Sequence, residues 1–97
     1  MTAVDLARSA VSEASPPVGL TAVARTLWFA KAGQWAAAHD LCQNIPGSAG
    51  SWLHAYLHRE EGDLPNASYW YVRAGRPAPA PTVSLADEWL EIATALL

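Results

Sequence analysis

The sequence predicts an all-α fold in which two helical hairpins are flanked by an N-terminal and a C-terminal helix. Alanine, the residue with the highest helix propensity, makes up about a fifth of the 97 residues. Apolar residues recur at helical spacing, and glycine and proline stand mostly between these stretches. A chain of this length folds around one core, so we expect a single helical domain over residues 1–97.

The N-terminal helix is expected over residues 1–15. Thr2 and Asp5 have the spacing of a capping box, in which each side chain accepts a hydrogen bond from the other residue's backbone amide. Pro16 and Pro17 end this helix, because proline removes a backbone donor and clashes with the preceding turn.

The two hairpins are expected over residues 18–76. Their helices are predicted, in chain order, over residues 18–32, 34–44, 51–61 and 64–74. Gly33 and Gly62 separate the two helices of each hairpin, since glycine most readily adopts the left-handed conformation that ends a helix. Asp63 stands in the N-cap position of the last of these helices, and the proline pair starts the first.

A proline-rich connector over residues 77–83 leads to a C-terminal amphipathic helix over residues 84–97. Ser84 and Asp87 repeat the spacing of a capping box. The helix carries the clearest apolar stripe of the chain, formed by Leu85, Trp89, Ile92, Ala93 and Leu96. We expect the acidic residues of this helix to contact solvent on the opposite side: Asp87, Glu88 and Glu91.

Residues 33–38 align with residues 62–67, each running from a helix end through a tight turn to a small residue in the next helix. The pattern resembles the tetratricopeptide repeat, over about residues 21–76. This resemblance implies helix-packing positions in the second hairpin at Ala55, Ala67, Tyr71 and Ala74. The chain also resembles a second family, over residues 52–63, 66–67 and 69–71. That family comprises small uncharacterised bacterial proteins, and the resemblance implies no function.

The repeat resemblance also implies a concave face lined by the first helix of each hairpin. The residues that it places there are Val23, Leu27, Lys31, Trp52, Tyr56 and Arg59. Tryptophan, tyrosine and arginine are the residues most enriched at interface hot spots. We therefore predict a non-catalytic interaction module that binds a protein or peptide, or a second copy of itself, in this groove. In the alternative, the C-terminal helix fills the groove and buries its own apolar stripe there.

The histidines suggest a second candidate function. His54 and His58 lie four residues apart and Glu61 three residues further on, so adjacent turns of one helix present two imidazoles and a carboxylate. His39 and Cys42 on the preceding helix could face them across a hairpin interface and complete a zinc-type site. Because no familiar zinc motif is present, the alternative is that these histidines are buried structural residues.

Composition argues against several other classes of function. The net charge is −3, and the six basic residues form no continuous stripe, so we expect no nucleic-acid partner. No apolar run is long enough to span a membrane, and one cysteine with no apolar leader predicts a cytoplasmic protein. Cys42 lacks the electropositive surroundings of a nucleophile, so we expect no enzymatic activity and no cofactor.

Overall fold

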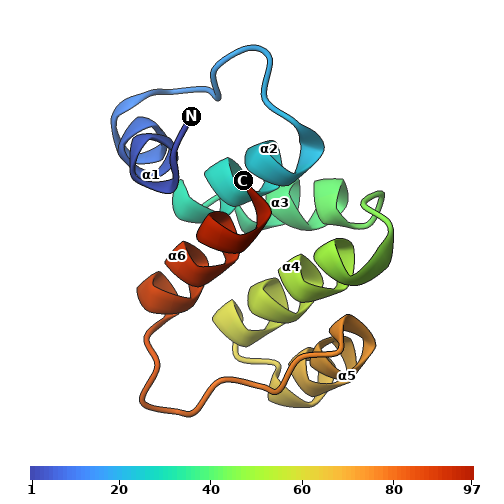
Figure 1. The fold of residues 1–97 in the computed structure, drawn as a ribbon. Coiled ribbons are helices and arrows are strands. Elements are labelled where there is room, and N and C mark those ends of the chain that lie inside the picture. The colour runs from blue at the N-terminus through green and yellow to red at the C-terminus, as the bar shows by residue number, and fades with distance from the viewer.

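The computed structural model describes all 97 residues and confirms the all-α prediction (Figure 1). It contains no strand and six helices: α1 (Ala3–Ser12), α2 (Ala22–Lys31), α3 (Trp35–Cys42), α4 (Gly47–Glu60), α5 (Leu64–Ala74) and α6 (Leu85–Leu96). Helices α2 and α3 form one hairpin and α4 and α5 form the other, with α1 and α6 packed on their flanks. None of the six combines the length and the apolar character that a membrane crossing requires.

The chain reverses direction at Gly33 and Gly62, the two glycines expected to separate the helices of each hairpin. Both have a positive φ angle, +79° and +88°, which glycine adopts without steric cost. After Gly62, the backbone amide of Asp63 donates to the carbonyl of His58 at 2.9 Å. The Asp63 carboxylate then accepts from the Asn66 amide and caps α5, as predicted.

A tight corner between α3 and α4 joins the two hairpins. Pro46 is the N-cap of α4, and Gly50 in the first turn of that helix lies against the backbone of Ile45. A Cβ atom added at Gly50 would come within 1.8 Å of the Ile45 carbonyl oxygen, so no larger residue fits there. This close approach holds the start of α4 beside the end of α3 and sets the spacing of the side chains between them.

Helix α6 lies across α2 and α4 and completes the core (Figure 1). Trp89 is fully buried, and its indole N–H donates to the carbonyl of Leu27 at 2.9 Å. Ile92 and Ala93 are also fully buried, so the middle of the predicted apolar stripe faces the core, whereas Leu85 at its start is 36% exposed. Helix α1 packs beside α2, where the indole N–H of Trp28 donates to the Ser9 hydroxyl at 3.0 Å.

The predicted start of α2 at residue 18 is wrong, because the helix begins at Ala22. The proline pair leads into a turn in which Gly19 has a φ angle of +86°, outside the helical region. The helix starts only after Thr21, whose hydroxyl accepts from the Ala24 amide at 3.1 Å. A side-chain cap therefore sets this boundary instead of the nearest prolines.

Three further bounds differ from the predictions. Helix α4 begins at Gly47, directly after its N-cap Pro46, instead of at residue 51. Helices α1 and α3 end early, at Ser12 and Cys42. Helices α5 and α6 have the predicted bounds to within a residue.

Glu88, expected on the solvent side of α6, is instead 2% exposed. Its carboxylate accepts hydrogen bonds from Nη1 of Arg59 at 2.9 Å and from the Tyr71 hydroxyl at 2.5 Å. The other terminal nitrogen of Arg59 donates to the carbonyl of Val83 in the connector. A buried carboxylate is tolerated when a cation and hydrogen-bond donors satisfy it, so this network joins α4, α5 and α6.

Candidate metal centre

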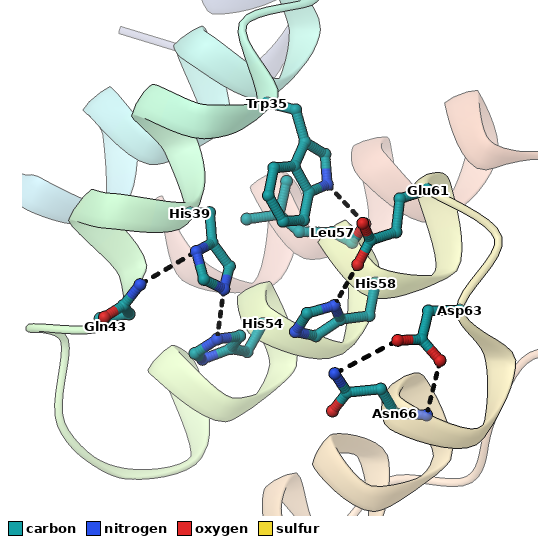
Figure 2. A network of polar contacts seen from close by, with 9 residues as sticks. All are labelled: Trp35, His39, Gln43, His54, Leu57, His58, Glu61, Asp63 and Asn66. Carbon is teal, nitrogen blue, oxygen red and sulfur yellow. Dashed lines mark hydrogen bonds and ion pairs between the residues drawn. The ribbon is translucent and has the colours of Figure 1, made fainter.

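Three histidines from two helices meet between the hairpins (Figure 2). His54 and His58 lie one turn apart on α4, and His39 projects toward them from α3. One ring nitrogen from each histidine lies within 4.8 Å of the other two, and Nε2 of His39 is 3.0 Å from Nε2 of His54. The helix spacing and the corner at Gly50 thus bring His39 of α3 to the two imidazoles of α4.

The ring nitrogens that face away from the cluster have partners of their own. Nδ1 of His58 lies 2.6 Å from the Glu61 carboxylate, and Nδ1 of His39 lies 2.9 Å from the Gln43 side-chain amide (Figure 2). Each partner sits three or four residues along the same helix, which fixes the rotation of the ring. These contacts leave Nε2 of both imidazoles facing the cluster, where Nε2 of His39 shares a hydrogen bond with Nε2 of His54.

Two tryptophans enclose the histidine cluster. The Trp35 ring stacks on His39, with ring centres 4.7 Å apart and planes 10° apart. The Trp70 ring stacks on His54 at 4.0 Å and 5°. The indole N–H of Trp35 also donates to the carbonyl of Leu57 at 2.7 Å, which ties this side of the cluster to α4 (Figure 2). The imidazoles are therefore held in place by packing as well as by hydrogen bonds.

Burial keeps His54 uncharged at neutral pH. His54 and His58 are each 7% exposed. Desolvation, followed by the neighbouring His39 and His58, lowers the pKa of His54 from 6.5 to about 4. The neutral imidazole is the form in which histidine binds a metal ion, so His54 needs no deprotonation before it can act as a ligand.

The geometry of the cluster is close to that of a metal site. A tetrahedral zinc ion with zinc–nitrogen distances of about 2.0–2.1 Å separates its ligand nitrogens by about 3.3–3.4 Å. The nitrogens of His39 and His54 lie just inside that separation, and a ring nitrogen of His58 lies within 4.8 Å of ring nitrogens of both. Three protein ligands leave one tetrahedral position open, which is the arrangement of zinc sites that exchange a water or a substrate.

Of the five residues suggested as metal ligands, the structure places three in the cluster. Glu61 lies outside it, bonded to His58, and belongs with Asp63 to a second, exposed group. The Cys42 thiol donates to the carbonyl of His39 at 3.2 Å, and burial, with a contribution from Asp40, raises its pKa to about 12. Cys42 is thus a protonated, buried thiol that borders the site but does not face its centre.

The six residues predicted to line a partner groove lie on α2 and α4, the two helices that α6 crosses: Val23, Leu27, Lys31, Trp52, Tyr56 and Arg59. The Leu27 carbonyl accepts the Trp89 indole, the Lys31 ammonium lies 5.0 Å from the centre of the same ring, and Arg59 binds Glu88. The two aromatic members are at most 4% exposed. In this structure the chain's own C-terminal helix occupies the face.

Three residues around the cluster are not predicted as site residues from the sequence: Trp35, Gln43 and Trp70. A local sequence signal was present for two of them, because Trp35 and Gln43 stand four residues before and four residues after His39, at the start of α3 and at its C-cap. No local sequence signal identifies Trp70, since its contact with His54 depends on how α4 and α5 pack.

Comparisons with protein-family models, with curated proteins and with solved structures find no match to this chain. The two resemblances noted from the sequence stay predictions, and any function has to be argued from the geometry of the site.

Proposed function

We propose that this chain binds a divalent transition-metal ion of the zinc type through the imidazoles of His39, His54 and His58. The observation that carries this proposal is the convergence of three ring nitrogens, from two helices, within 4.8 Å of one another. Imidazole nitrogens favour zinc, copper and nickel over magnesium and calcium, which prefer oxygen ligands.

The outer partners of the imidazoles support the same proposal. A carboxylate that accepts the Nδ1 proton of a histidine is a common second partner of zinc ligands, because it orients the ring and makes Nε2 a better donor. Glu61 stands in that position on His58. A half-turn of the Gln43 amide would let its oxygen accept the Nδ1 proton of His39 in the same way. Within the cluster, Nε2 of His39 and Nε2 of His54 now share one hydrogen bond, and a metal ion would take the place of its proton.

Calorimetric titration of zinc into protein purified without a histidine tag tests the proposal. We expect one ion per chain, and loss of that binding in the His54→Ala/His58→Ala double variant. The Asn44→Ala variant, altered at the exposed end of α3, serves as the control and should bind as the wild type does. Circular dichroism monitors folding, and His39→Ala tests the same site if the double variant unfolds. Full zinc binding by folded variants would disprove the proposal.

A second candidate function is favoured by the way α6 lies on α2 and α4. On this face α6 is held by the buried Trp89 and by the ion pair of Glu88 with Arg59. A partner helix with a similar pattern of residues could bind the same face by displacing α6. A labelled peptide spanning residues 82–97 provides the test. The Trp89→Ala substitution weakens the packing of α6 on α2 and α4. The peptide should therefore bind the Trp89→Ala variant at least tenfold more tightly than it binds the wild-type chain. Equal or absent binding to both would contradict this function.

A further inference from the structure

A cavity of about 760 Å³ opens beside the imidazole cluster and is lined in part by all three histidines. None of its lining residues is an aspartate or a glutamate, although the chain has nine acidic residues and a net charge of −3. Most of the lining is polar, so the cavity differs from the apolar pockets that bind hydrophobic ligands. Its composition is that of a site for a small polar or anionic molecule.

One cation lies on the wall of this cavity without a carboxylate partner. The guanidinium of Arg73 lies 5.5 Å from the centre of the Trp70 ring, and Trp70 in turn stacks on His54. The two ion pairs of the chain involve other residues, His58 with Glu61 and Arg59 with Glu88. Apart from one hydrogen bond, which Nη1 of Arg73 donates to the Tyr69 hydroxyl at 3.4 Å, the guanidinium is available to a ligand.

Helix α4 contributes hydrogen-bond donors to the same cavity. The first turn of α4 borders the cavity at Gly47 and Gly50, and no side chain caps this 14-residue helix. The Ser51 side chain also lines the cavity. Ser51 is only 9% exposed, and its hydroxyl forms no hydrogen bond within the chain. Free amides at a helix N-terminus together with a free hydroxyl are groups that bind oxyanions.

The charge of a bound metal also favours an anion in this cavity. A divalent ion held by three neutral imidazoles keeps both its charges, and Glu61, behind His58, offsets only one of them. The open coordination position is the natural place for the compensating anion.

We propose that the ion at His39, His54 and His58 takes a small oxyanion, such as a carboxylate or a sulfate-like group, as its fourth ligand, and that Arg73 and Ser51 bind the same molecule. This inference rests on the proposed metal site. One oxygen of the anion binds the metal, while others accept hydrogen bonds from the guanidinium and the hydroxyl. The guanidinium fork matches the geometry of such groups.

Cobalt(II) replaces zinc for the test, because its visible absorption reports both binding and a change of ligand. Acetate and sulfate are titrated separately into the cobalt-loaded full chain. We expect a saturable spectral change with at least one of them. Arg73→Gln should raise the half-saturating anion concentration about three- to tenfold without altering cobalt affinity. Arg76→Gln, which removes a guanidinium that stacks on Trp52 instead, is the matched control and should behave as wild type.

The outcomes separate the two proposals. If no cobalt spectrum develops, the metal site itself is wrong and the anion site falls with it. If cobalt binds but neither anion changes the spectrum, the metal site stands and the oxyanion ligand is disproved. An equal response of the Arg73→Gln and Arg76→Gln variants would overturn the role of Arg73. Ser51→Ala, a small change in the lining of the same cavity, gives an independent check and should weaken anion binding in the same direction.

Discussion

The orientation of single imidazoles decides what the histidine cluster can do. Glu61 and Gln43 each contact the ring nitrogen that faces away from the cluster, and Trp35 fixes the plane of His39 by stacking. Such outer contacts are what distinguish a metal-ready site from a chance group of histidines.

Glu61→Gln is therefore expected to lower zinc affinity about tenfold, since a neutral amide is a weaker acceptor for the Nδ1 proton of His58. Competition against a chromophoric chelator measures this affinity. Glu91→Gln, an equivalent change on the exposed side of α6, should leave it unchanged. If both variants bind zinc as wild type does, Glu61 does not support the site.

The buried tyrosines give a second test at this scale. Burial is the main cause that raises the pKa of Tyr56 and of Tyr71 above the usual value of 10, and the hydrogen bond to Glu88 raises that of Tyr71 further. Their contribution to stability is fully present below pH 10, the unfolded-state value, and is lost as the pH rises above it. We expect the tyrosinate absorbance of these two residues to appear together with loss of helical circular dichroism. Ionisation of all tyrosines at the normal pH in a folded chain would contradict their burial.

At the scale of the helix, α6 is held by one polar network as well as by its apolar stripe. Glu88 lies one residue before Trp89, and its burial depends on Arg59 from α4 and Tyr71 from α5. The apolar stripe of α6 was predictable because it repeats at helical spacing. The burial of Glu88 was not, since its partners come from two other helices.

Glu88→Ala should destabilise the fold by about 2–3 kcal/mol, because it leaves the Arg59 charge and the Tyr71 hydroxyl without their partner. Tyr71→Phe removes a single hydrogen bond and should cost about 1 kcal/mol. Urea unfolding followed by circular dichroism measures both, and Glu91→Ala is the exposed control on the same helix. A loss no larger for Glu88→Ala than for Glu91→Ala would show that the network does not hold α6.

Some helix bounds could be predicted from the sequence and others could not. The bounds of α5 and α6 follow from caps that are visible in the sequence, Asp63 and Ser84. The start of α2 was misplaced because the proline pair is the more obvious signal, whereas the Thr21 hydroxyl and the turn at Gly19 decide it.

At the scale of the whole molecule, the proposed metal site connects the two hairpins. His39 belongs to the first hairpin, and His54 and His58 belong to the second. The sequence suggested this pairing from the order of the helices, but the corner at Gly50 that sets the distance between them was not foreseen. The anion cavity is likewise a tertiary feature, since α3, α4 and α5 all contribute to it.

A ligand that binds only the folded chain stabilises it by mass action. Zinc at a hundredfold excess over its dissociation constant should add about 2.7 kcal/mol, which for a domain of this size raises the melting temperature by about 10–20 °C. A chelator should reverse the effect, and the His54→Ala/His58→Ala variant should not show it. An equal rise in that variant would place the stabilising ion elsewhere.

The metal site is tested most directly by NMR spectra that correlate the imidazole nitrogens of each histidine with its ring protons, recorded with and without one equivalent of zinc. The account predicts that zinc shifts Nε2 of His39, His54 and His58 together, while Nδ1 of each stays protonated or hydrogen-bonded. Nitrogen shifts that do not change on adding zinc, or that change in only one of the three rings, would contradict a shared site.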